Sequence, residues 1–379
     1  MNNHQHMTKK TTQIIINSFI GATGLGFPSV LPMLIGAIVD TLGYSRAMVG
    51  WISSANILGI AVGGLIATLL IGKRPLVQIV RVGLLGLLLF DTLSMFVEAS
   101  NTMIGTRFLS GVFGGLVYAG GLAAFSGLKN PIKAYGIYVI VFCIWSGFIM
   151  VILPMLMQYF GLVGGFGVLV GMAFVSLLGS GVIPHLAKNI QEKELDLSFL
   201  LKQKEVGLTL LGYFALMLAG GTTFTYAERI AKEAGLDTLL TGQLLGASTI
   251  LALLGGFLVF KLGDSKGLKM PIVLGVVTMG AGVLLLFWST SPIIYFIGIS
   301  LFGGAWSFAI PFYQQIQSKF DPTGKVVSLG TIVNTLGRAT GPALAALFLG
   351  GQSFTMVLWI SLVALVLSLV AVFPLLMRK

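Results

Sequence analysis

The sequence is poor in charged residues, in cysteine and in histidine. Only 9% of its 379 residues are charged, whereas a soluble domain carries roughly 25%. The single cysteine, Cys143, excludes an internal disulfide framework and a cysteine metal site. The three histidines, His4, His6 and His185, all lie outside the long apolar segments. We therefore expect no metal and no organic cofactor, and an enzyme built on buried His, Asp or Cys clusters has little support.

The sequence also lacks the features that are typical of ATP-hydrolysing proteins and of nucleic-acid-binding proteins. A phosphate-binding loop requires Gly-x-x-x-x-Gly-Lys-Ser/Thr, but the Gly-Lys pairs at Gly72 and Gly324 are followed by Arg74 and Val326. ATP hydrolysis by this chain is thus not expected, which leaves an ion gradient or the solute's own gradient as the energy source. The net charge of +11 is spread over short loops, so no basic face is predicted that would bind nucleic acid.

Long apolar stretches are abundant instead. Hydrophobic residues make up 56% of the chain, and apolar runs of about 20 residues, enough to cross a bilayer as a helix, recur from end to end. The sequence predicts an all-α integral membrane protein with twelve transmembrane helices in two six-helix bundles. The expected ranges are 14–39, 47–71, 76–97, 101–127, 134–159, 162–183, 205–229, 238–262, 270–289, 292–317, 325–349 and 353–376.

The one densely charged interval lies at the midpoint and divides the chain. We expect an N-terminal bundle over 1–184, a cytoplasmic linker over 185–204 and a C-terminal bundle over 205–379. Shifting the sequence on itself by 192 residues superposes 42–83 on 234–275 and indicates an internal repeat, because five glycines coincide, far more than chance predicts. The pairs are Gly43 with Gly235, Gly50 with Gly242, Gly63 with Gly255, Gly64 with Gly256, and Gly83 with Gly275.

Basic residues favour one orientation in the membrane. If both termini are cytoplasmic, eighteen of the 23 Lys and Arg residues face the cytoplasm, and only Arg46, Arg229 and Lys232 face the other side. The first apolar segment is too long for a signal peptide and is interpreted as a retained helix. We expect a multi-pass protein of a bacterial inner membrane, in contact with lipids and monomeric.

Three local patterns occur in this chain. Arg107 to Gly111, followed by Gly114 and Gly115, forms an Arg-x-x-x-Gly pattern in the fourth predicted helix. Residues 337–343 contain a Gly-Pro element, and residues 262–269 form a loop with Gly, Asp and Lys. These patterns resemble the fourth-helix motif, the eleventh-helix Gly-Pro element and a degraded copy of the cytoplasmic loop motif of the major facilitator superfamily, and the resemblance extends over essentially the whole chain. The family's fifth-helix Gly-Pro antiporter motif is absent. The segment 226–256 is nevertheless most similar to the drug and metabolite efflux branch, which implies efflux by antiport.

The resemblance also implies roles for particular residues. Proton coupling is associated with the arginine of the fourth-helix motif, here Arg107. The cytoplasmic gating loops would contain Lys73 and Arg74 in one half and Asp264 and Lys266 in the other, although the first loop lacks the expected Asp. Helices one, four, seven and ten surround the substrate cavity in this family. The polar and aromatic candidates on them are Asn17, Tyr118, Thr223, Tyr226, Trp306, Tyr313 and Gln314, each of which could instead serve interhelical packing.

Ionisable side chains within the predicted spans are costly to bury and are therefore functional candidates. Asp91 and Arg107 each lie eight positions from residue 99 in the turn between two spans, so a charge pair is geometrically available. That pair is either a static bridge or a proton-sensitive switch. Glu228, near the outer end of the seventh helix, is a further candidate for charge pairing or proton coupling.

Arg338 falls near the middle of the eleventh predicted helix and is the strongest substrate candidate. Its planar donor fork suits a carboxylate, phosphate or sulfonate. Alternatively, backbone carbonyls or Glu228 satisfy it.

These features together predict a secondary active transporter. We expect a proton-linked exporter that moves a small organic anion, zwitterion or amphipathic metabolite by alternating access. The alternative is an uptake carrier or uniporter of a similar solute, and a membrane-embedded enzyme or receptor is the least favoured possibility.

Overall fold

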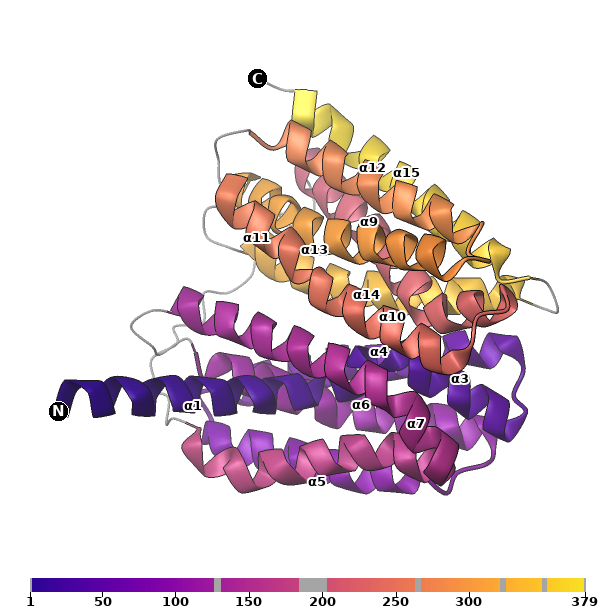
Figure 1. Cartoon of the computed structure of the whole chain (residues 1–379). Coiled ribbons are helices and arrows are strands. Elements are labelled where there is room, and N and C mark those ends of the chain that lie inside the picture. Colours follow the sequence, from indigo (N-terminus) through magenta and orange to yellow (C-terminus); the bar gives the residue numbers. More distant parts are fainter. Residues whose placement is uncertain are drawn as a thin grey trace. The chain divides into compact units, whose positions relative to one another are not determined.

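The computed structural model is helical, as the apolar pattern predicts. It describes residues 2–125, 131–183, 203–262, 267–320, 325–349 and 353–377. The helices, shown in Figure 1, begin with α1 (Asn2–Gly24), α2 (Gly26–Ser29), α3 (Leu31–Leu42), α4 (Arg46–Leu70), α5 (Leu76–Leu93), α6 (Ser100–Ala123), α7 (Pro131–Gly179) and the short 3₁₀ helix η1 (Ser180–Val182). They continue with α9 (Lys204–Glu233), α10 (Thr238–Leu251), α11 (Leu253–Leu262), α12 (Lys269–Leu286), α13 (Pro292–Phe320), α14 (Lys325–Phe348) and α15 (Thr355–Met377).

The chain divides into two compact units. The first combines Met1–Tyr44 with Ala55–Gln191, and the second combines Ser45–Ser54 with Glu192–Lys379. Nearly all of the expected linker, 185–204, lies outside the described residues.

The start of α4 belongs to the second unit, which the sequence pattern does not indicate. Within that unit the Ser54 hydroxyl donates to the Ala339 carbonyl over 2.6 Å. A Cβ added at Gly50 would lie 2.1 Å from the Pro342 carbonyl oxygen, so these two backbones touch only because residue 50 is glycine.

The first predicted span is a broken helix rather than a continuous one. Non-helical residues Leu25 and Val30 separate α1, α2 and α3, and the prolines at 28 and 32 explain the break, because proline lacks the amide hydrogen that helix continuation requires. Just before the break, the α1 backbone closely approaches α6, since a Cβ at Gly24 would lie 2.5 Å from the Gly114 carbonyl oxygen. The break therefore places Phe27 next to α6.

Helix α7 contains two of the predicted segments, 134–159 and 162–183. They are separated at Gly161, whose φ of 57° and ψ of −144° are not helical. Side-chain-bearing residues rarely adopt a positive φ, so a glycine at this position lets the chain change direction.

The internal glycine repeat corresponds to equivalent helix crossings in the two units. In the first unit, a Cβ at Gly63 would lie 1.8 Å from the Val112 carbonyl oxygen, so α4 touches α6. In the second unit, a Cβ at Gly255 would lie 2.2 Å from the Gly304 carbonyl oxygen, so α11 touches α13. Gly43 and Gly235 also match, because both adopt a positive φ, of 64° and 85°. The repeat in the sequence thus corresponds to a repeat in the structure.

All twelve expected ranges are occupied by helix. Within the described residues, eight helices are long and apolar enough to cross a membrane. Helices α6 and α14 do not qualify, since each carries an arginine and several small or polar residues. The number of crossings therefore stays a prediction.

Candidate functional site

A buried ion pair lies between α5 and α6. The Arg107 Nη2 atom is 2.9 Å from Asp91 Oδ1, and 0% of the arginine side chain and 5% of the aspartate side chain are exposed. The two residues meet because α5 and α6 form an antiparallel hairpin in which both lie at the same distance from the connecting turn. The spatial pairing follows the sequence argument, whereas its role in proton coupling stays a prediction.

The rest of the Arg107 guanidinium has an unusual environment. Nη2 also donates to the Phe90 carbonyl and to the Ser94 hydroxyl. The charged group lies 5.1 Å from the centre of the Phe27 ring and 4.8 Å from that of Phe166, both within cation–π range. Nε and Nη1 are buried and have no hydrogen-bond partner among the described residues.

Two serines, which the sequence did not suggest as site residues, each form a hydrogen bond with one member of the ion pair. Ser110 donates to Asp91 Oδ1 over 2.8 Å, and Ser94 accepts from Arg107. Each is three residues after one member of the pair, so each shares a helix face with it. That spacing is a sequence signal which could have identified both.

Asn56 brings α4 to the same place. Its Nδ2 donates to the Arg107 carbonyl over 2.9 Å, while its Oδ1 is buried without a hydrogen-bond partner among the described residues. The close approach depends on glycine, since a Cβ at Gly111 would lie 2.1 Å from the Asn56 carbonyl oxygen. No local pattern in the sequence reveals Asn56.

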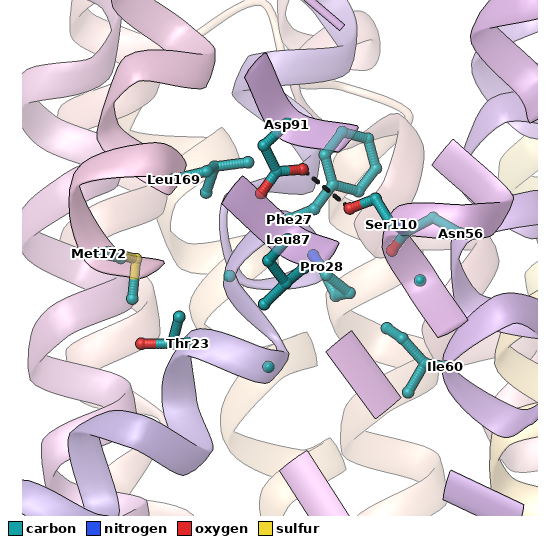
Figure 2. A pocket seen from close by; sticks show the side chains of 13 residues that line it. Thr23, Phe27, Pro28, Asn56, Ile60, Leu87, Asp91, Ser110, Leu169 and Met172 are labelled. Carbon is teal, nitrogen blue, oxygen red and sulfur yellow. Dashed lines mark hydrogen bonds between the residues drawn. The ribbon is translucent and has the colours of Figure 1, made fainter. Parts of the chain in front are cut away.

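A small cavity adjoins the pair. Figure 2 shows Asp91 and Ser110 joined by a hydrogen bond, with the other lining side chains around them. The polar members are Thr23, Asn56, Asp91 and Ser110, and the apolar wall includes Leu87, Leu169 and Met172. The space admits about one water molecule.

Glu228 forms a second buried ion pair, in the second unit. Its Oε1 accepts from Nη2 of the adjacent Arg229 over 2.8 Å, and both side chains are largely buried. Arg229 was predicted as the last residue of the seventh helix and was counted on the side opposite the cytoplasm. It lies within α9, which runs on to Glu233, four residues beyond the predicted end.

Arg338 lies on α14, half-buried, with its guanidinium 5.6 Å from the Trp306 ring centre. Two glycines of α9 make room for this arrangement. A Cβ at Gly220 would lie 2.5 Å from the Trp306 ring, and one at Gly221 would lie 2.5 Å from the Arg338 carbonyl oxygen. The structure thus brings together two of the expected substrate residues.

Three other cavity candidates make buried interhelical hydrogen bonds. Thr223 donates to Ser361 over 2.8 Å, Tyr226 donates to the Pro342 carbonyl over 3.3 Å, and Tyr313 shares a hydrogen bond with Ser368. These contacts match the packing alternative that the sequence left open.

The remaining candidates are more dispersed. Asn17 is buried with its Oδ1 lacking a hydrogen-bond partner in the described ranges, Tyr118 lies 6.2 Å from Tyr138 between ring centres, and Gln314 is half-buried. Lys73 and Arg74 are exposed in the turn after α4, as a loop role requires. Asp264 and Lys266 lie outside the described residues.

Among the described residues, no group of three His, Cys, Asp or Glu side chains could hold a metal ion. The charged side chains described above can form ion pairs, exchange protons and, in the case of arginine, recognise anions.

Comparison with known proteins identifies the family and the fold. The family model of the Major Facilitator Superfamily matches residues 14–342. The solved structure of a mutant of the nucleoside transporter NupG has a TM-score of 0.78 at 14% identity, with 97% of this chain and 99% of that chain covered. A bacterial homologue of the human lysosomal transporter Spinster has a TM-score of 0.71 at 13% identity, with 97% and 94% covered. Curated proteins give no significant match.

At these identities the structural neighbours establish the fold alone, whereas the family model extends over most of the sequence. The chain belongs to the major facilitator superfamily and is a multi-pass integral membrane transporter.

Proposed function

We propose that this protein is a proton-linked secondary transporter of a small organic anion, zwitterion or amphipathic metabolite, with Asp91 as the residue that takes up the proton. The observation that carries the proposal is the buried contact between Asp91 and Arg107. Alternating access between the two units would move the solute. A bacterial inner membrane with both termini in the cytoplasm is the proposed setting.

Burial is what would link protonation of Asp91 to movement. As an ion pair the two side chains are jointly neutral, but a protonated Asp91 would leave the Arg107 charge uncompensated at a site that is 0% exposed. Breaking a buried pair in this way costs roughly 3–5 kcal/mol. A rearrangement that gives Arg107 another partner or access to water becomes favourable once the proton binds, so the proton shifts the conformational equilibrium.

Arg338 and Trp306 support the substrate class. A half-buried guanidinium over an aromatic ring presents a flat, positively charged surface, and such a surface suits a carboxylate, sulfonate or phosphate, with or without an attached ring. Nucleosides are the named substrates of one structural neighbour, but its 14% identity does not extend them to this chain.

Export is the proposed direction, and it rests on the resemblance of residues 226–256 to the efflux branch. The alternative is uptake or uniport of a similar solute. Flux into proteoliposomes with and without an imposed pH gradient separates proton-linked transport from uniport, because a uniporter responds only to the solute gradient.

The test of proton coupling uses Asp91→Asn. Solutes are first selected from small carboxylates, sulfonates and zwitterionic amino acids by thermal shift, and their flux is then measured in proteoliposomes at several pH gradients. The wild type is expected to accumulate solute against its gradient when a pH gradient is imposed. Asp91→Asn is expected to exchange solute but to lose the accumulation, because its side chain cannot take up the proton.

The control is Ser146→Ala, which removes a buried α7 hydroxyl that does not line the cavity and is expected to keep wild-type coupling. If Asp91→Asn still accumulates solute in response to the gradient, the buried pair is a static bridge and the proposal fails.

A further inference from the structure

We propose that the cavity beside Asp91 binds one water molecule, held by Asn56 Oδ1 and the Asp91 carboxylate, and that this water delivers the proton to Asp91. This inference rests on the proposed function, since it specifies the route by which that proton arrives. It also assigns Asn56 as a positioning residue.

Asn56 provides the first reason to place a ligand here. The residue is 1% exposed, and its Oδ1 has no hydrogen-bond partner among the described residues. A buried polar group without a hydrogen bond destabilises the structure that holds it. Because Asn56 lines the cavity, a donor bound there would satisfy this oxygen.

The size and composition of the cavity point to water. Its space suits about one water molecule, and buried waters make about three hydrogen bonds to otherwise unsatisfied groups. Asn56, Asp91 and Ser110 supply polar atoms on its wall. The Thr23 hydroxyl also lines the space but is already hydrogen-bonded to the Phe19 carbonyl and to Ser176. Figure 2 shows Asp91, Ser110 and Asn56 near one another, whereas the Thr23 oxygen points away from them.

Charge balance disfavours an ion as the resident ligand. Asp91 and Arg107 already neutralise each other at 2.9 Å, and the other lining residues from α1, α2, α4, α6 and α7 are all uncharged. A metal cation would leave a net positive charge beside a fully buried arginine, and an anion would face the Asp91 carboxylate. A neutral molecule that both donates and accepts hydrogen bonds avoids both penalties.

The proton step balances with a hydronium ion from the aqueous side as its only further reactant. As the cavity water accepts a proton from the aqueous side, one of its O–H bonds breaks with the electron pair kept by the water oxygen. A new O–H bond forms on the Asp91 carboxylate, and the water is neutral before and after. Arg107 then loses its charge partner, and this loss triggers the rearrangement.

The experiment follows protonation of Asp91 directly, in the full-length protein in detergent. After a rapid drop in pH, time-resolved infrared spectroscopy records the carbonyl stretch of the protonated carboxyl group, which is assigned by its loss in Asp91→Asn. Two variants remove the water in different ways. Asn56→Leu removes its acceptor, and Gly26→Ala adds a methyl group to the cavity wall, 3.3 Å from the Leu169 side chain.

The matched control is Gly179→Ala. Its added methyl group meets the apolar side chain of Ile16 at 3.2 Å, a distance similar to that between the Gly26 methyl group and Leu169, but Gly179 does not line the cavity. We expect Asn56→Leu and Gly26→Ala to slow proton uptake by at least about tenfold, since proton transfer depends on a positioned partner. Gly179→Ala is expected to react at the wild-type rate.

The outcomes separate the two proposals. If the wild type shows no protonation of Asp91, both proton coupling and the water route fail. If Asp91 takes up its proton but Gly26→Ala reacts as fast as Gly179→Ala, the water route alone is wrong. Asn56→Leu also removes a hydrogen bond to α6, so if that variant does not fold, the two glycine variants by themselves decide whether the water route holds.

Discussion

At the scale of single residues, contacts from both helices of one hairpin hold the Asp91–Arg107 pair. Asp91 and Arg107 lie on consecutive helices at equal distances from one turn, so their pairing follows from the antiparallel hairpin. Ser94 and Ser110 follow from the same geometry, one turn further along each helix. Asn56 and Phe166 do not, because their helices join the pair only through tertiary packing.

Arg338 can be tested as a charge selector. Arg338→Gln removes the cation, whereas Arg338→Lys keeps it but loses the planar fork over Trp306. For a carboxylate selected by thermal shift, we expect the dissociation constant to rise by about tenfold in Arg338→Lys and by more in Arg338→Gln. Titration calorimetry measures both values.

A zwitterionic or neutral analogue of the same carboxylate serves as the control ligand. Its affinity is expected to change less, because it depends less on the cation. Equal loss of affinity for both ligands would mean that Arg338 supports the packing of α14 rather than the choice of substrate.

At the scale of helices, glycine decides which faces touch. Gly63 and Gly255 lie at equivalent crossings, where any side chain would collide with a backbone carbonyl. Their sequence neighbours Gly64 and Gly256 have no atom within 4 Å of an added Cβ. Adjacent glycines therefore have opposite roles, one at a helix contact and one facing open space.

Alanine substitutions separate these roles. Gly63→Ala and Gly255→Ala are expected to destabilise the protein by about 1–3 kcal/mol, because the helices must move apart. Gly64→Ala and Gly256→Ala are expected to be neutral, or stabilising by up to about 1 kcal/mol, because alanine favours the helix. Unfolding in detergent, followed by circular dichroism, ranks the four variants. Equal stability of Gly63→Ala and Gly64→Ala, or of Gly255→Ala and Gly256→Ala, would contradict the proposed helix crossings.

Helix interruptions were only partly foreseeable. Prolines at 28 and 32 signal a bend in the first span, but the sequence did not show that it divides into α1, α2 and α3. Gly161, whose φ is positive, is the position within α7 where one predicted span ends and the next begins. The end of α9 was misplaced because Glu228 and Arg229 resemble a polar boundary, whereas they neutralise each other and stay buried.

At the scale of the whole molecule, the orientation is the main untested prediction. Lys and Arg favour the cytoplasm for both termini. In a Cys143→Ser background, Asn2→Cys and Lys379→Cys are expected to react with a membrane-impermeant maleimide in inverted vesicles but not in intact cells. Labelling of the two positions from opposite sides would overturn the even number of crossings.

The sequence by itself determined the class of this protein, its helical segments, its internal repeat and its family. The physical reason is that lipid offers the backbone no hydrogen bonds, so each long apolar run must form a helix. Only the tertiary structure decided that Asn56, Phe27 and Phe166 surround the Asp91–Arg107 pair, and that Ser45–Ser54 packs within the second unit. Those contacts depend on how each helix is rotated and on where glycine lets two backbones meet, and neither is encoded in the spacing of residues along one helix.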